Sequence, residues 1–398
     1  MIIARRPDAV TNPQFWAEDG ATWFAQAYQK GGLHVLTAPY GGYVIAWARL
    51  VAWGAQAFPV GRAPLLYNLA GFALQLAPPV YIATRRFDHL IPDWRVRALL
   101  IALYLAIPAS AEIDVNLTNA QWHAAVMLPL LAFALPPVRL WGRIVEGALF
   151  LLLALTGPFC LLMLPLLVWY AWARRWPLWL RVVCGLDMVA VVIQLHAIAQ
   201  SAGQRRLVFG GQIPLLVRAA AGRTIVSLAV GQRGYAALVS SVRGWPLTLI
   251  LTSALVVGIV ILALAWLHGS LELRVFLVYG VLMLGSAFLV VPVGSSVKNQ
   301  WGALAMPGLG GRYFFVPMLA VVAALGSLLG ARRRAVRRAA LIVVAVIVCV
   351  GVPLDWVEPH YVDYHFSTQV ARCFAEPRGS PCRIPINPPG WSIEFTRQ

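Results

Sequence analysis

Long apolar runs recur along the whole chain, and short polar segments rich in arginine separate them. A helix that crosses a bilayer needs about 20 predominantly apolar residues, and the runs reach or approach that length. The pattern therefore predicts an all-α polytopic membrane protein with about ten transmembrane helices. The expected spans are 64–84, 98–111, 122–138, 144–157, 158–173, 182–199, 246–267, 274–292, 313–330 and 339–353.

The composition excludes an ordinary soluble domain. Of the 398 residues, 60% are hydrophobic and only 12% are charged, whereas soluble domains carry about 25% charged residues. The net charge of +17 would suit a nucleic-acid-binding protein. In a chain with many spans it instead reflects topology and contact with anionic membrane lipid, so we expect no nucleic-acid partner.

Arginine-rich loops set the predicted topology. Fifteen of the 32 Lys and Arg residues lie in five short loops, at 85–97, 139–143, 174–181, 268–274 and 331–338. Cytoplasmic loops carry an excess of Lys and Arg, so these five loops should face the cytoplasm. The use of 30 Arg and only 2 Lys suggests a GC-rich bacterial genome. We therefore expect the chain in the inner (plasma) membrane of a bacterium.

This topology divides the chain into three predicted parts. Residues 1–63 form an external acidic loop with juxtamembrane helices, residues 64–353 form the transmembrane bundle, and residues 354–398 form an external tail. The bundle also has external loops at 112–121, 200–245 and 293–312.

The tail carries Cys373 and Cys382, which are close enough in sequence to pair. An extracytoplasmic compartment permits a disulfide there, and unpaired thiols fit the sequence equally well. The proline-rich end of the tail should be extended and pack as a cap, since residues before proline avoid helix.

The apolar segment 43–58 does not fit the count of spans. It contains Arg49 and four aromatic residues, and we interpret it as an interfacial helix on the outer leaflet. The first span is then 64–84, which runs inward and leaves a 63-residue external N-terminus. We expect an additional helix upstream of Met1, which would make eleven; direct translocation of the N-terminal tail is the alternative.

An adjacent pair of carboxylates, Glu18 and Asp19, stands out in the predicted external N-terminal part, because only 15 residues of the chain are acidic. A carboxylate can act as a general base when it reaches the hydroxyl group of an acceptor. Asp19 is favoured for this role because it precedes Gly20, a potentially flexible residue. Alternatively, both carboxylates simply stabilise the N-terminus of an amphipathic helix at 21–29.

A second polar cluster lies in the predicted external loop 112–121 and the residues after it. Oxygen-rich loops can hold a divalent cation or bind sugar hydroxyls, and an indole ring offers a stacking surface. A wet interfacial turn that caps helix ends would have the same composition. The candidates for substrate binding are Glu112, Asp114, Asn119, Gln121, Trp122 and His123. If a metal is bound, its possible ligands are Glu18, Asp19, Glu112 and Asp114.

External arginines are candidates for binding a phosphate group, because the planar guanidinium matches phosphate oxygens in pairs. Arg312 follows two glycines at the mouth of a predicted span, and Arg205 and Arg206 lie in the loop 200–245. Anchoring among lipid headgroups is the alternative for each of these arginines.

The order of these features resembles the first external loop of GT-C membrane glycosyltransferases. Glu18-Asp19-Gly20 is followed by an amphipathic segment, by Gly31-Gly32 and by Pro39-Tyr40-Gly41-Gly42-Tyr43. This order is similar to that in lipid A aminoarabinose transferases and protein O-mannosyltransferases, although the pair reads Glu-Asp rather than Asp-Glu.

The resemblance implies a GT-C-like bundle that takes a sugar from a polyprenyl-phosphate donor and transfers it to an envelope glycan, lipid or protein on the outer face of the membrane. It implies that Asp19 or Glu18 is catalytic and that Tyr43 lies near the substrate. A lipid-linked-sugar transporter or flippase, or a non-catalytic membrane scaffold, would share the helices and the basic loops without needing the acidic pair.

Overall fold

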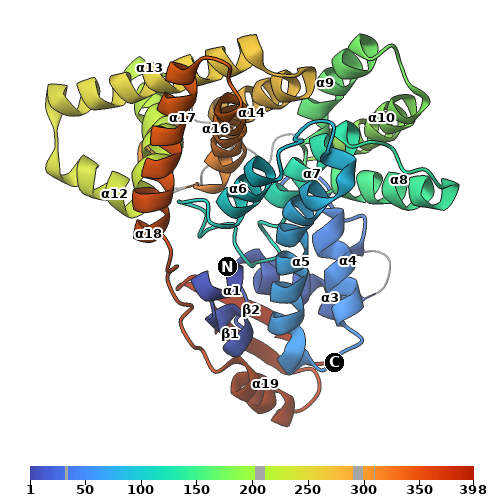
Figure 1. The fold of residues 1–398 in the computed structure, drawn as a ribbon. Coiled ribbons are helices and arrows are strands. Elements are labelled where there is room, and N and C mark those ends of the chain that lie inside the picture. Colours follow the sequence, from blue (N-terminus) through green and yellow to red (C-terminus); the bar gives the residue numbers. More distant parts are fainter. Residues whose placement is uncertain (32–34, 202–210, 290–298, 309) are drawn as a thin grey trace.

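The computed structural model describes residues 1–31, 35–201, 211–289, 299–308 and 310–398, and in these ranges the chain is helical apart from one β-hairpin (Figure 1). Seven helical segments are long and apolar enough to cross a membrane, which is compatible with an all-α membrane protein. Six of them correspond to predicted spans. They are Val60–Ala83 with helix α5 (Ala63–Ala83), α10 (Leu178–Gln200), α13 (Gly244–His268), α14 (Leu271–Leu289), α16 (Arg312–Leu329) and Arg334–Leu354, which contains α17 (Arg334–Val346), a π-helix (Ile347–Gly351) and α18 (Val352–Leu354).

The other four predicted spans are helices that are too short to cross a bilayer unaided. They have 12 to 15 residues, fewer than the roughly 20 that a perpendicular span needs. These helices are α6 (Trp94–Leu105), α7 (Gln121–Phe133), α8 (Leu140–Ala154) and α9 (Cys160–Ala173). In the sequence, prolines and the turn at Gly157 indicate the ends of these four helices only approximately.

The predicted external loop 200–245 is largely helical rather than a loop. Its described part runs from Ile213 to Ser241 as α11 (Ile213–Val217), a π-helix (Arg218–Val226) and α12 (Ser227–Ser241), and it is long and apolar enough to cross a membrane. The helix breaks at Gly231, whose φ of 74° is unfavourable for a residue with a side chain. Beyond the break, the Asp355 carboxylate accepts hydrogen bonds from the backbone N–H groups of Gln232 and Arg233, which restarts the helix.

The five arginine-rich loops gather at one end of the bundle, which we call the basic end. Arg86 pairs with Glu146 of α8, and Arg174 pairs with Glu272 of α14. Ile91, Ser270 and Gly330 line a single cavity there. The clustering agrees with the predicted grouping of these loops.

Both chain termini lie together at the opposite end, in what we call the terminal layer, residues 1–62 and 355–398 (Figure 1). Its N-terminal part contains α1 (Ile2–Arg5), α2 (Asp8–Thr11), a π-helix (Asp19–Phe24), α3 (Ala25–Lys30) and α4 (Ala46–Ala55). Its C-terminal part contains α19 (Phe366–Ala375) and the antiparallel strands β1 (Pro381–Ile386) and β2 (Trp391–Thr396). Helix α4 has only 10 residues, so the segment 43–58 does not form a span of its own.

The terminal layer has its own hydrophobic core, built from both ends of the chain. Phe15, Trp23 and Phe24 pack with Ile393 and Phe395 of the hairpin. One face of each strand is buried and the other is open, as expected when a hairpin covers a core. The tail is therefore a cap, although its residues 381–396 form a hairpin rather than an isolated extended chain.

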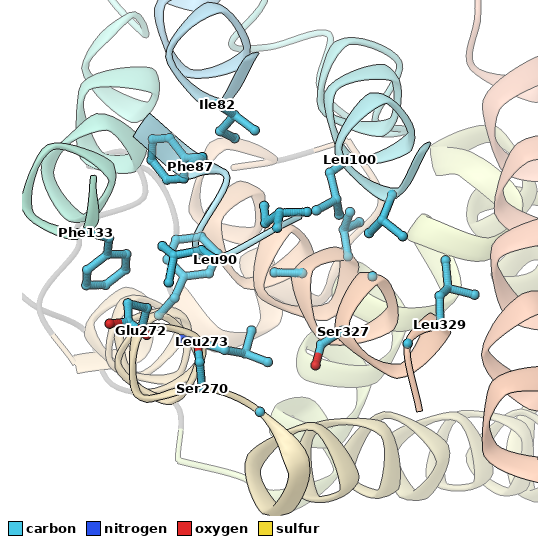
Figure 2. Close-up of a pocket in the computed structure, with 18 of the residues that line it drawn as sticks. Ile82, Phe87, Leu90, Leu100, Phe133, Ser270, Glu272, Leu273, Ser327 and Leu329 are labelled. Carbon is cyan, nitrogen blue, oxygen red and sulfur yellow. Dashed lines mark hydrogen bonds between the residues drawn. The ribbon is translucent and has the colours of Figure 1, made fainter. Parts of the chain in front are cut away.

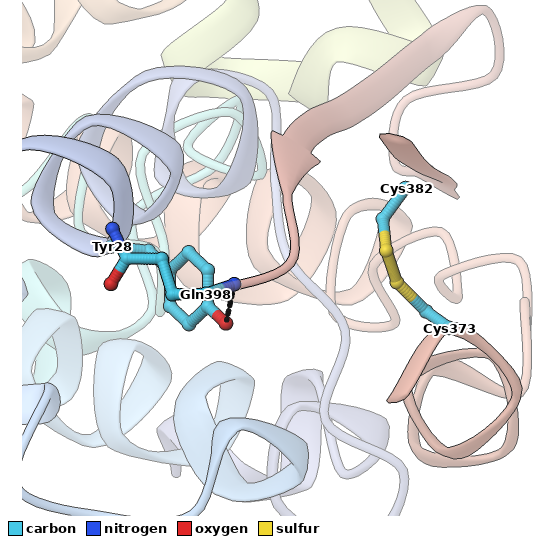
Figure 3. Close-up of a disulfide and its surroundings, with 4 residues drawn as sticks. All are labelled: Tyr28, Cys373, Cys382 and Gln398. Atoms are coloured by element: carbon cyan, nitrogen blue, oxygen red, sulfur yellow. Dashed lines mark hydrogen bonds between the residues drawn. A yellow bond between two sulfur atoms is a disulfide. The ribbon is translucent and has the colours of Figure 1, made fainter. Parts of the chain in front are cut away.

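One disulfide and one hydrogen bond hold the end of the tail. A disulfide joins Cys373 of α19 to Cys382 of β1, with a Cα–Cα distance of 5.8 Å (Figure 3). The backbone N–H of Gln398 donates to the Tyr28 hydroxyl at 3.4 Å. The sequence left the pairing of the two cysteines open, and the structure pairs them.

Ile393→Ala should lower the free energy of unfolding by about 2–5 kcal/mol, because Ile393 is fully buried and its truncation leaves a cavity. Ile3→Ala removes the same atoms at a residue that is 49% exposed, and it should change stability little. Thermal unfolding of the purified variants measures the difference. Equal losses in both would contradict a packed core in the terminal layer.

Candidate functional site

Asp19 anchors the N-terminal segment to the loop before α7. Its carboxylate is fully buried and accepts hydrogen bonds from the backbone N–H of Thr118 at 2.7 Å, the Thr118 hydroxyl at 2.6 Å and the backbone N–H of Leu117 at 3.2 Å. The Trp23 indole N–H in turn donates to the Thr118 hydroxyl. All of these groups are internal, so Asp19 holds two segments together and does not face a substrate.

Gly20 is packed rather than flexible. A Cβ at this position would lie 2.8 Å from the Ile393 side chain and 2.9 Å from that of Ile386. The glycine therefore lets the hairpin approach the acidic pair closely. Gly20 therefore gives Asp19 no advantage in flexibility over Glu18 as a general base.

Glu18 is half-buried and lies beside a tight turn. The Tyr40 hydroxyl donates to Glu18 Oε1 at 3.4 Å. Burial, together with the nearby Glu18 charge, raises the pKa of Tyr40 to about 12, so its hydroxyl remains protonated and able to donate. Tyr40 and Tyr43 exchange backbone hydrogen bonds across Gly41 and Gly42, whose φ values of 56° and 90° require glycine-like freedom.

Glu112 and Arg312 form an ion pair across the end of α16. Arg312 Nη1 donates to Glu112 Oε1 at 2.7 Å, and the Arg312 backbone N–H donates to Glu112 Oε2 at 3.0 Å. A carboxylate at a helix N-terminus is favourable because the first N–H groups have no partner within the helix. The Glu18 charge also acts electrostatically on Arg312, the predicted phosphate-binding residue.

Arg223 is the second cation at this place. It belongs to the π-helix Arg218–Val226, is 3% exposed, and donates from Nη1 to the Met306 carbonyl. Its Nη2 is buried without a hydrogen-bond partner among the described residues. Nη2 and Glu112 Oε2 both approach Gly311, at 3.6 and 3.4 Å from the Cβ position of that glycine. Arg223 therefore has an unused donor beside the Glu112–Arg312 pair.

Aromatic rings line the same place. The Tyr313 ring lies under the Arg312 guanidinium at 5.0 Å and meets the Trp122 ring edge-on at 5.3 Å. Tyr43 interacts electrostatically with Tyr313. We refer to Glu18, Glu112, Arg223 and Arg312 as the charged cluster: Glu112 pairs with Arg312 and approaches Arg223 at Gly311, and the Glu18 charge acts electrostatically on Arg312.

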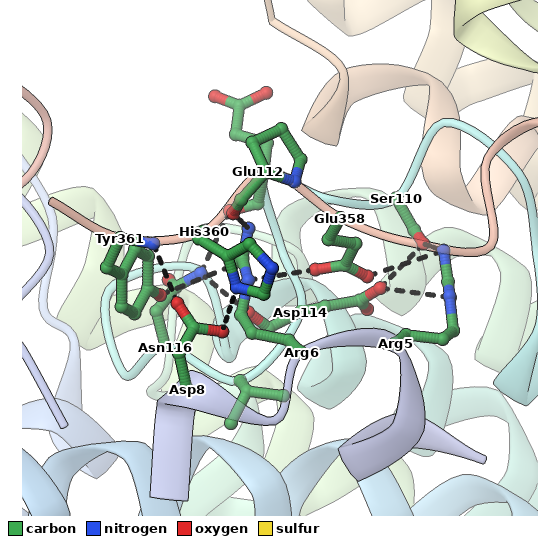
Figure 4. A network of polar contacts seen from close by, with 12 residues as sticks. Arg5, Arg6, Asp8, Ser110, Glu112, Asp114, Asn116, Glu358, His360 and Tyr361 are labelled. Atoms are coloured by element: carbon green, nitrogen blue, oxygen red, sulfur yellow. Dashed lines mark hydrogen bonds and ion pairs between the residues drawn. The ribbon is translucent and has the colours of Figure 1, made fainter. Parts of the chain in front are cut away.

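The remaining predicted residues of the second cluster serve the structure. Asp114 is buried against Arg5 and Ser110, in a network with Arg6 and Glu358 (Figure 4). The Arg5 guanidinium, despite the burial of the carboxyl, holds the pKa of Asp114 below its usual range. In Figure 4 the Glu112 side chain points away from this network.

The side chains of Asn119, Gln121 and His123 are also turned inward. The Asn119 amide donates to the Glu112 carbonyl at 2.8 Å, which fixes the backbone of the charged cluster. The Gln121 amide donates to the Thr118 carbonyl, and His123 bonds the Tyr104 hydroxyl at 2.7 Å in the core. None of the three faces the charged cluster as a direct ligand.

The structure thus brings Glu112, Arg312 and Trp122 together around Tyr313, while Glu18 and Tyr43 interact electrostatically with Arg312 and Tyr313. It buries Asp19, Asp114, Asn119 and His123 as supports. Arg205 and Arg206 lie outside the described residues. Among the described residues, no group of three or more His, Cys, Asp or Glu side chains is arranged to hold a metal ion.

The sequence alone did not single out Arg223, Tyr40 or Tyr313 as site residues. Arg223 was one of several external arginines in the sequence, and the small residues around it, Ala219–Gly222, were the signal that it packs closely against other segments.

No known protein-family model, curated protein or solved structure matches this chain.

Asp19 should make stability depend on pH. Burial raises the pKa of its carboxyl in the folded protein from 3.8 to about 7, against the three hydrogen bonds that lower it. Between these values the folded state binds more protons than the unfolded state, so the contribution of Asp19 to stability falls as pH rises from about 4 to about 7. The melting temperature of wild type, relative to that of Asp19→Asn, should decline across this window. A relative increase would contradict the assignment.

Proposed function

We propose that this chain is a GT-C-type membrane glycosyltransferase, which moves a sugar from a polyprenyl-phosphate donor to a glycan, lipid or protein acceptor. The observation that carries the proposal is the charged cluster: Arg312 pairs with Glu112, the buried Arg223 has a donor without a partner among the described residues, and the half-buried Glu18 acts electrostatically on Arg312. A general base and a site for a phosphate group are the two parts that such a transfer requires.

The reaction assigns a separate role to each charge. Glu18 takes the proton from the acceptor hydroxyl as its oxygen bonds the anomeric carbon of the sugar. The bond from that carbon to the phosphate oxygen breaks, and the electron pair leaves with the polyprenyl phosphate. The phosphate changes from a diester to a monoester, so its negative charge grows toward two. Arg312 and Arg223 stabilise that developing charge.

Glu112 holds Arg312 in place until the donor arrives. Its carboxylate accepts hydrogen bonds from both the Arg312 side chain and the first N–H of α16. A phosphate oxygen would also be favourable at that N–H group. Arg223 Nη2 has no hydrogen-bond partner in the part of the chain that the structure describes, so it can donate to a ligand. We infer that the donor phosphate binds first to Arg223 and then shares Arg312 with Glu112.

Glu18→Gln should reduce sugar transfer by about 10²- to 10⁴-fold, because the amide cannot accept the hydroxyl proton. The measurement uses purified protein in vesicles with radiolabelled polyprenyl-phosphate sugars and follows label that becomes resistant to mild acid. Glu376→Gln, the same change at an exposed residue of the terminal layer, should leave transfer intact. Full activity of folded Glu18→Gln would refute the catalytic role.

Arg223→Gln should weaken binding of polyprenyl phosphate by about tenfold to a hundredfold, because a buried hydrogen bond to a charged group is lost. Arg243→Gln removes the same charge from an exposed position and should bind like wild type. Titration of each protein with farnesyl phosphate, monitored by the rise in melting temperature, gives the affinities.

A transporter without transferase activity would move labelled donor between leaflets and leave the sugar on its carrier.

A further inference from the structure

A second hollow lies at the basic end, far along the helices from the charged cluster. It is a partly open cavity of about 420 Å³, lined mainly by apolar side chains from α6, α14, α16 and the segment that follows α5. Figure 2 shows Phe87, Leu90, Leu100 and Leu273 among the side chains that converge on it. Cavities of this volume hold small apolar ligands or single hydrocarbon chains.

The acidic groups in the wall are engaged within the protein. Asp93 accepts a hydrogen bond from the backbone N–H of Arg95 and caps α6. Glu272 pairs with Arg174 and accepts from the Tyr170 hydroxyl at 2.9 Å. The space between these groups is apolar, so a hydrocarbon chain suits it better than a polar substrate.

Exposed arginines follow two residues of the cavity wall closely in sequence. Arg332, Arg333 and Arg334 follow Gly330 of the wall, and Arg95 follows Asp93. These four arginines form no ion pair with any described residue. Their charge is therefore available to an anionic group that sits over the cavity.

Exposed tryptophans lie beside the arginine-rich loops of the basic end. Trp94, Trp141 and Trp172 are 70%, 72% and 67% exposed, and each adjoins one of the arginine-rich loops. Indole rings favour the headgroup region of a bilayer, where their apolar bodies and polar N–H groups are both accommodated. The mouth of the cavity thus lies where a lipid phosphate would be, and its interior lies where an acyl chain would begin.

We propose that this cavity binds an anionic phospholipid, with one acyl chain inside it and the phosphate against Arg332, Arg333 and Arg334. The combination of an apolar cavity, unpaired arginines at its mouth and a belt of exposed tryptophans favours this occupant over a soluble metabolite. The site is independent of the proposed transfer reaction, because it lies at the other end of the bundle.

The experiment reconstitutes the whole protein in vesicles of equal parts palmitoyl-oleoyl phosphatidylglycerol and phosphatidylcholine. The protein is then extracted in mild detergent, and the retained lipid is counted by native mass spectrometry. Wild type should retain phosphatidylglycerol in preference to phosphatidylcholine. The triple variant Arg332→Gln, Arg333→Gln, Arg334→Gln should lose that preference, by roughly fivefold for each arginine that contacts the phosphate.

Two pairs of variants separate the cavity from general charge. Arg62→Gln, Arg372→Gln, Arg378→Gln removes the same charge from exposed positions in the terminal layer and should retain lipid like wild type. Ser327→Trp fills the cavity and should release the lipid, whereas Ser327→Ala should keep it.

Equal retention of the two lipids by wild type would overturn the proposal. Unchanged phosphatidylglycerol retention in the Arg332→Gln, Arg333→Gln, Arg334→Gln variant would also overturn the proposal. This variant changes only exposed residues, so it tests the proposal even if Ser327→Trp does not fold. Retention by a folded Ser327→Trp protein would also refute occupancy of the cavity.

Discussion

The buried carboxylate of Asp19 is the contact on which the candidate site depends. It is removed from water and must take its hydrogen bonds from Leu117 and Thr118, so it fixes the N-terminal segment against the loop before α7. Glu18 is the preceding residue, so its backbone is fixed as well, and its charge acts electrostatically on Arg312 of the Glu112–Arg312 pair. One residue of the acidic pair anchors the backbone, and its neighbour remains accessible.

A buried network of opposite charges makes the second tie between distant segments. Arg5 and Arg6 from the N-terminus meet Asp114 from the middle of the chain and Glu358 from the tail. Removing charges from water is costly, and loss of one partner would leave the others uncompensated. This network therefore requires all three segments to be in place. It fixes Asp114, and with it the loop that also carries Glu112 of the charged cluster.

Helix content and the grouping of arginine-rich loops could be read from the sequence, because apolar runs and charge bias are properties of single segments. The short lengths of α6–α9 and the helix at 213–241 could not, since packing against other helices decides where such helices begin and end. The roles of Glu18 and Asp19 were also hidden, because adjacent carboxylates differ only in the distant groups that they meet. Arg223 joins the cluster through tertiary contacts that no local spacing records.

The central claim is that Glu18 faces a phosphate site formed by Arg312 and Arg223. The most direct measurement is an electron cryo-microscopy structure of the full chain with farnesyl phosphate. The account predicts phosphate density within hydrogen-bond distance of both guanidinium groups, with the Glu18 carboxylate on the same side and Asp19 still bonded to Leu117 and Thr118. Phosphate bound elsewhere, with Arg223 and Arg312 unchanged, would contradict it.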